Sequence, residues 1–148
     1  MSKGADLSFD TTLLVRDTCL CLHLQRAART TARRFDDALR PLGLNNGQFS
    51  LLVSLNRSQP PTIGSVASLL GMDRTTLTAA LKPLVRRGLI GVKADPNDRR
   101  GRLLTLTAAG RRLAASAVPV WKRTHHAFDS MFESLEPQRL REDLRVLS

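Results

Sequence analysis

The stretch GSVASLLGMDRTTLTAALKPLVRRGLI, residues 64–90, decides the fold, because it predicts two short helices joined by a tight turn. The first helix is expected over residues 63–70, where four apolar residues recur at the i, i+3, i+4 and i+7 spacing of one helical face: Ile63, Val66, Ala67 and Leu70. Gly71 fits the C-terminal cap of this helix. Asp73 fits the N-terminal cap of a second helix that ends at Gly88. The pattern predicts a helix-turn-helix.

The second of these helices has an apolar face and an opposite face that is polar and cationic. At 100° per residue, the opposite face carries Thr75, Thr78, Lys82 and Arg86, with Arg74 at its edge. A short helix of this kind fits the major groove of DNA, where threonine hydroxyls bond phosphates or base edges and basic side chains reach guanine or phosphate. We expect a bend or a loosening at Pro83. The predicted DNA contacts are Arg74, Thr75, Thr76, Thr78 and Lys82.

A basic hairpin follows the helix-turn-helix. Residues 89–94 and 103–107 read as two strands, and the sequence DPNDRRGR between them, residues 95–102, reads as a long turn. Like charges at a hairpin tip repel one another and give no benefit to the fold, but they suit DNA phosphates or a narrow minor groove. Asp98 fits the fork of an arginine. The predicted DNA contacts in this wing are Arg99, Arg100 and Arg102.

Helical segments flank this core on both sides. One long helix is expected over residues 13–42, with an apolar stripe that runs from Cys21 to Leu42 and includes Phe35 and Leu39. A second helix is expected over residues 45–56, capped by Asn45 or Asn46.

In the C-terminal part, mostly apolar residues recur at an average spacing of 3.5 residues, which places them in one row along a helix. We call this row the seam. Its members are Ala114, Val118, Trp121, His125, Phe128, Phe132 and Leu135. Pro119 is expected to kink this helix, and Pro137 to start a final short one. The seam packs against another helix, either within the chain or in a second chain, and a partner chain is the more economical choice for so short a protein.

The composition favours a polyanionic partner. The chain has 148 residues and a formal net charge of +10, and neutralising phosphates releases condensed counterions. No apolar run reaches the ~20 residues of a membrane span, and residues 1–10 lack the pattern of a signal peptide. These features, with two cysteines read as reduced thiols, predict a cytoplasmic protein with no membrane partner. An RNA-binding or membrane-surface basic protein remains the alternative reading of the charge.

The sequence holds no recognisable catalytic constellation. We find no nucleophile–base–orienter set and no glycine-rich phosphate loop, so we expect neither an enzyme nor a cofactor. Cys19 and His23 are four residues apart, but two ligands do not make a closed zinc site, so no metal is expected.

The helix-turn-helix stretch and the wing stretch DPNDRRGRLLTLTAAG, residues 95–110, together resemble the MarR family of regulators. The resemblance covers nearly the whole chain. It implies a mainly α fold with a small β-hairpin wing: a winged helix-turn-helix DNA-binding domain over residues 45–110, plus a helical dimerisation region formed by residues 1–44 and 111–148. It also implies a homodimer on a pseudo-palindromic operator, usually as a repressor, in which Asp98 steadies Arg100 in the minor groove.

The resemblance further implies a response to a small effector, often an anionic aromatic molecule. By position, the candidate pocket residues are His23, Arg26 and Phe49. Cys21 lies close to where the hydroperoxide-sensing branch of the family carries its reactive cysteine. The tyrosines that hold the thiolate in that branch are absent, and Gln25 and Phe35 stand at the matching positions. Cys21 is therefore either an oxidant sensor or a small hydrophobic residue buried in the stripe. A non-specific basic nucleic-acid-binding protein is the other alternative function.

Overall fold

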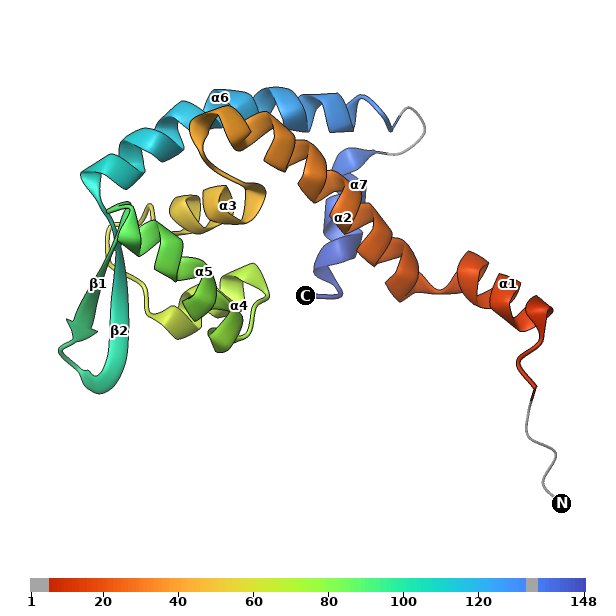
Figure 1. The fold of residues 1–148 in the computed structure, drawn as a ribbon, viewed down its shortest axis with the longest axis horizontal. Coiled ribbons are helices and arrows are strands. Elements are labelled where there is room, and N and C mark those ends of the chain that lie inside the picture. The colour runs from red at the N-terminus through yellow and green to blue at the C-terminus, as the bar shows by residue number, and fades with distance from the viewer. Residues whose placement is uncertain (1–5, 133–135) are drawn as a thin grey trace, which may run out of the picture. The chain divides into compact units, whose positions relative to one another are not determined.

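The computed structural model describes residues 6–132 and 136–148, and the expected seam position Leu135 lies outside them. Figure 1 shows a mainly helical chain with one β-hairpin, and the chain divides into two compact units, residues 1–34 and 35–148. The elements in chain order are α1 (Phe9–Thr18), α2 (Leu20–Leu39), the 3-10 turn η1 (Arg40–Leu42), α3 (Asn46–Ser54), α4 (Ile63–Leu70), α5 (Arg74–Arg86), β1 (Ile90–Asp95), β2 (Asp98–Leu106), α6 (Ala108–Asp129) and α7 (Pro137–Arg145).

The single long helix expected over residues 13–42 is wrong. The chain leaves the helical conformation at Cys19, which has φ −68° and ψ 105° and separates α1 from α2. The carbonyl oxygen of Cys19 then accepts the backbone N–H of His23 and lies 2.8 Å from its Nδ1, so Cys19 immediately precedes the first turn of α2. α1 is rich in β-branched residues, which are weak helix formers, and this favours the break.

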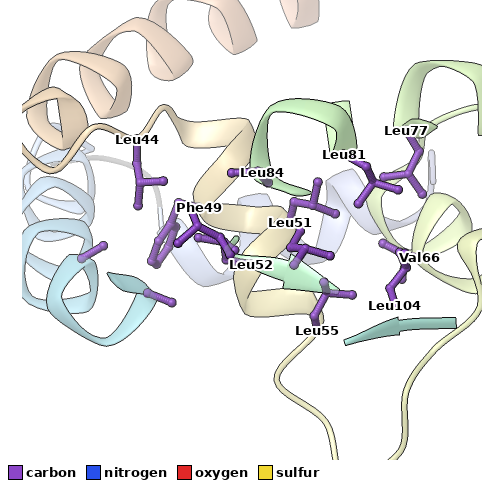
Figure 2. Close-up of a cluster of buried hydrophobic side chains, with 14 of the residues drawn as sticks. Leu44, Phe49, Leu51, Leu52, Leu55, Val66, Leu77, Leu81, Leu84 and Leu104 are labelled. Atoms are coloured by element: carbon purple, nitrogen blue, oxygen red, sulfur yellow. The ribbon is translucent and has the colours of Figure 1, made fainter. Parts of the chain in front are cut away.

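The second unit is built around a core that α3, α4, α5 and the hairpin share, as Figure 2 shows. α3 begins with a capping box in which Asn45 and Gln48 each bond the backbone N–H of the other, confirming Asn45 as the cap. The large side chains with less than 2% exposure are Leu39, Leu51, Leu52, Val66, Leu77, Leu84 and Leu104.

The helix-turn-helix follows the bounds that its caps predict. α4 covers the expected residues, and Gly71 ends it with φ 64°, a left-handed conformation that glycine adopts without steric cost. Asp73 caps α5, whose helix continues past Pro83 to Arg86. The turn between the helices is thus fixed by two local signals, one from each side.

The hairpin differs from expectation at its tip. β1 and β2 pair antiparallel, with Ile90 opposite Leu106, and only residues 96 and 97 lie between them. The long turn expected over residues 95–102 is therefore wrong, and the wing arginines lie on β2. Two aspartates tighten the turn: Oδ1 of Asp95 accepts the backbone N–H of Asn97 at 2.9 Å, and Oδ1 of Asp98 accepts that of Arg100 at 3.0 Å.

α6 is one helix through Pro119, and part of its seam is covered within the chain. The ring of Phe128 stacks on Phe35 at 5.5 Å between centroids, and Trp121 stacks on Phe49 at 6.3 Å. α7 has no buried residue and is tied to α6 by Arg141, which lies 3.3 Å from Oδ1 of Asp129. Hence the seam alone does not prove a partner chain.

Candidate nucleic-acid interface

α5 presents the expected polar face to solvent. Leu77, Leu81 and Leu84 are buried against the core, which leaves the opposite side of the helix open. The predicted contact residues on this helix are all exposed: Arg74, Thr75, Thr76, Thr78 and Lys82. Arg86, one turn beyond Lys82, is exposed as well and extends the cationic surface.

The three threonines at the start of α5 are not equivalent. The hydroxyl of Thr76 donates to Oδ2 of Asp73 at 2.8 Å, and that of Thr78 donates to the carbonyl of Arg74 at 2.8 Å. Within the described ranges, the hydroxyl of Thr75 has no hydrogen-bond partner. Of the three hydroxyls, only that of Thr75 can donate to an acceptor on DNA without first breaking an internal bond.

The Asp73 carboxylate caps the N-terminus of α5. The backbone N–H of Thr76 and then its hydroxyl, both donating to this carboxylate, lower the pKa of Asp73 below its usual range. The negative charge also lies at the positive end of the helix dipole. Asp73 is therefore ionised at neutral pH and holds the first turn of the helix in place.

The wing arginines, Arg99, Arg100 and Arg102, are exposed along β2. Among the described residues none of them forms an ion pair with a carboxylate. Asp98 holds the backbone N–H of Arg100, whereas the resemblance led us to expect a contact with the arginine side chain. Nη1 of Arg102 donates to the carbonyl oxygen of Gly101 at 3.0 Å, and the positive charges of the wing otherwise face solvent, where an anionic partner can meet them.

A polar cleft of about 320 Å³ brings α5 and the wing together. Arg74 lines it together with Arg100 and Arg102, as do Asp95 and Asp98. Gly101 leaves room for the two carboxylates, since a Cβ there would lie 3.1 Å from Oδ2 of Asp98. Sequence reasoning placed Arg74 on the helix edge but gave no sign that it shares a cleft with the wing.

A second cleft of about 540 Å³ lies between α5 and β1 and is largely apolar. Ile63, Leu81, Val85 and Val92 line it, and Lys82, Arg86 and Arg102 add basic groups. The sequence did not indicate Val92 as a cleft residue. Apolar and polar residues alternate along its short strand, but this alternation does not show which surface of the hairpin Val92 faces.

The comparisons with known proteins agree on one family. A sequence model of the MarR family matches residues 44–101. The organic hydroperoxide resistance transcriptional regulator of Bacillus subtilis is 30% identical over 101 residues, which are 68% of this chain and 69% of the relative. The chain belongs to the MarR family.

Two further relatives extend the match over most of the chain. The transcriptional repressor MprA of Escherichia coli is 27% identical over 148 residues, 99% of this chain and 81% of the repressor. The crystal structure of the M. tuberculosis transcriptional regulator MOSR in complex with DNA has a TM-score of 0.76 and 38% identity, covering 87% of this chain and 92% of that one. The fold class is confirmed, and these relatives are regulators rather than enzymes.

The other site residues predicted for this MarR-family chain fall in different units. His23 and Arg26 lie on α2 in the first unit and are exposed, whereas Phe49 is 6% exposed in the core of the second. Cys21 is exposed, so the expectation that the stripe buries it is wrong. No described residue of the first unit covers it, and its Sγ accepts a hydrogen bond from Nε2 of Gln25 at 3.3 Å.

Within residues 6–132 and 136–148, no three histidine, cysteine or acidic side chains gather as a metal site would need. Across the same ranges, the helices lack the combination of length and apolar character that crossing a bilayer demands.

Proposed function

We propose that this MarR-family protein is a cytoplasmic, homodimeric transcriptional repressor that binds a pseudo-palindromic duplex operator. The observation that carries the proposal is the meeting of two cationic surfaces. The exposed face of α5 adjoins a wing whose three arginines have no carboxylate partner among the described residues.

The two surfaces suit the two grooves of DNA. α5 is narrow and bears small polar side chains, so it enters the major groove, and the wing arginines reach the adjacent minor groove or its phosphates. The formal net charge of +10 adds a counterion-release term to the affinity. The relative MOSR, whose crystal structure contains DNA, supports this function.

Exposed apolar residues in the helical segments support the homodimer. Phe9, Leu14 and Val15 on α1 are 73%, 60% and 52% exposed, and Leu144 on α7 is 40% exposed. Such side chains gain free energy when a partner covers them. These four residues fall in the proposed dimerisation region, residues 1–44 and 111–148, and the proposed DNA-binding domain is residues 45–110. The repressor role is supported by the relative MprA.

The experiment is the selection of bound duplexes from a random pool, with affinity then measured at several salt concentrations. We expect an enriched two-fold symmetric site and a complex with two chains per site by sedimentation. Arg100→Ala should bind the selected site more weakly and with a shallower salt dependence. Binding with no enriched sequence, or equal binding to structured RNA or anionic vesicles, would contradict the proposal in favour of a non-specific basic protein.

We also propose that a small anionic aromatic molecule releases the protein from its operator, with His23 and Arg26 on α2 as candidate contacts. Arg26 is exposed and offers a fork that matches a carboxylate. Benzoate is a suitable probe, and it should raise the Kd for the operator in the native protein but not in Arg26→Gln. Phe49 is unsuitable for this test, because its ring belongs to the core. An equal response of the native protein and Arg26→Gln would exclude Arg26 as the contact.

Oxidant sensing by Cys21 is a second candidate. The thiol is exposed and accepts a hydrogen bond from Gln25, at one of the positions matched to an activating tyrosine, and a relative is an organic hydroperoxide resistance regulator. The thiolate would attack the peroxide, break the O–O bond and become a sulfenic acid, while the released alkoxide takes up a proton. Hydroperoxide should then lower operator affinity in the native protein and leave Cys21→Ser unchanged, with Cys19→Ser as the matched control. An identical response of the native protein and Cys21→Ser would exclude Cys21.

A further inference from the structure

The side chain of Arg74 occupies a place that is open only because residue 64 is a glycine. Gly64 is the second residue of α4, and a Cβ built on it would lie 2.5 Å from Nη2 of Arg74 and 3.3 Å from its Cζ. These separations are shorter than ordinary contact between heavy atoms. The guanidinium of Arg74 therefore rests directly on the bare backbone of the first turn of α4.

This placement turns Arg74 away from the outer face of α5 and towards the wing. Arg74 and Gly64 line the same polar cleft as Arg100 and Arg102. In the described part of the chain, Arg74 makes no side-chain hydrogen bond or ion pair, so all its N–H donors are available. Asp95 and Asp98 line the cleft as well, so two carboxylates oppose three guanidinium groups. The cleft keeps an excess of positive charge, which favours an anion at the arginine side.

The position against α4 indicates which part of DNA Arg74 meets. In a helix-turn-helix, the second helix lies in the major groove while the first helix crosses the sugar-phosphate backbone. A guanidinium resting on the first helix is thus beside phosphates, whereas base edges are reached from the outer face of the second helix, where Thr75 and Lys82 lie.

We propose that Arg74 is a phosphate contact shared by the recognition helix α5 and the wing, and that Gly64 is the positioning residue that sets it there. This inference rests on the proposed function and deepens it. It divides the predicted contacts into base readers on α5 and a phosphate clamp formed by Arg74 with the wing arginines.

A double-mutant cycle on the full chain tests the proposal, using the duplex selected above. The proteins are native, Gly64→Ala, Arg74→Ala and the double variant. Gly47→Ala is the matched control, because Gly47 is the second residue of α3 and a Cβ there meets only Oδ1 of Asn45, at 3.5 Å. Alanine is the better helix former, so neither glycine substitution should lower the Tm.

Arg74→Ala should weaken binding roughly tenfold, as expected for one lost hydrogen bond to a charged group. It should also reduce the salt slope by about 0.9 for each lost phosphate contact, and weaken all single-base variants of the site alike. Gly64→Ala should weaken binding by at least about twofold in the native background and not at all in the Arg74→Ala background. Gly47→Ala should leave Kd unchanged.

Two results would overturn the inference while leaving the proposed function intact. An equal effect of Gly64→Ala in both backgrounds would show that Gly64 does not act through Arg74. Loss of discrimination at a single base pair in Arg74→Ala would show that Arg74 reads a base. Failure of the native protein to bind any duplex would instead overturn the proposed function, and this inference with it.

Discussion

Asp73 holds Thr76 at the start of the recognition helix with both of its carboxylate oxygens. Oδ1 accepts the backbone N–H of Thr76 and Oδ2 accepts its hydroxyl, each at 2.8 Å. The cap therefore uses a side chain that lies at the proposed interface with DNA. The same aspartate is the N-terminal cap of α5, so one ionised group holds the first turn of this helix.

We predict that the cap makes stability depend on pH. The hydrogen bonds from Thr76 lower the pKa of Asp73 in the folded chain below its unfolded value of about 3.9. The stabilisation is thus fully present above pH ~4 and is lost as the pH falls through the lower, folded pKa. Asp73→Ala should lower the Tm at neutral pH by about 2–4 °C, whereas Asp73→Asn should keep the cap and remove its acid dependence. If the native protein, Asp73→Ala and Asp73→Asn had equal Tm values at every pH between 3 and 7, the cap would not contribute to stability.

Thr75 and Thr78 should differ in their effect on DNA binding. Only Thr75 has a hydroxyl that is free to donate, since that of Thr78 is bonded to the carbonyl of Arg74. We expect Thr75→Val to weaken operator binding about three- to tenfold, the value of one neutral hydrogen bond, and Thr78→Val to have a smaller effect. Fluorescence anisotropy with a labelled operator measures both, and a larger loss in Thr78→Val would contradict the assignment.

Asp98 should act through the backbone of the wing rather than through the charge of an arginine. Its Oδ1 accepts the N–H of Arg100, and an asparagine keeps this acceptor. Asp98→Asn should therefore bind the operator as tightly as the native protein, or more tightly because an acidic charge near phosphate is removed. Asp98→Ala should bind several-fold more weakly, since the loss of one hydrogen bond that orders the wing is worth about 1 kcal/mol. Equal weakening in both variants would favour pairing with the Arg100 guanidinium.

The sequence was informative where local signals decide the structure, and less so where distant residues meet. Gly71 and Asp73 act on their own helix ends, so the bounds of α4 and α5 followed from them. The break at Cys19 lies just before the first member of the apolar stripe, Cys21, and neither a glycine nor a proline marks it in the sequence. The wing tip is shorter than expected because Asp95 and Asp98 each accept a nearby backbone N–H, and composition alone does not show these hydrogen bonds. The meeting of Gly64 with Arg74 depends on how two helices cross, and nothing in the residue pattern indicates it.

The stacked pair of Phe49 and Trp121 should stabilise the fold more than it serves a ligand. Phe49 is 6% exposed, and its ring packs on α6 through Trp121. Phe49→Ala should reduce the free energy of unfolding by about 3–5 kcal/mol, as measured by urea denaturation. Phe49→Leu keeps most of the volume and should cost less than about 1.5 kcal/mol. If Phe49→Ala left the free energy of unfolding unchanged but abolished a response to the effector, Phe49 would be a ligand contact rather than a core residue.

Gly110 is the point at which α6 passes closest to the end of the helix-turn-helix. A Cβ at this residue would lie 2.1 Å from the carbonyl oxygen of Leu89. That oxygen accepts the backbone N–H of Thr107, and the Thr107 hydroxyl lies between it, at 3.0 Å, and the carbonyl oxygen of Gly88, at 2.7 Å. A backbone oxygen moves only when its own chain moves, so Gly110→Ala must either shift α6 or break the Thr107 bonds. We expect a loss of about 3 kcal/mol of stability, at the upper end of what overpacking costs. Gly47→Ala, in open surroundings, is the control and should be neutral or stabilising. Equal unfolding midpoints in urea for the two variants would show that the start of α6 yields easily, and that its link to the wing through Thr107 is not rigid.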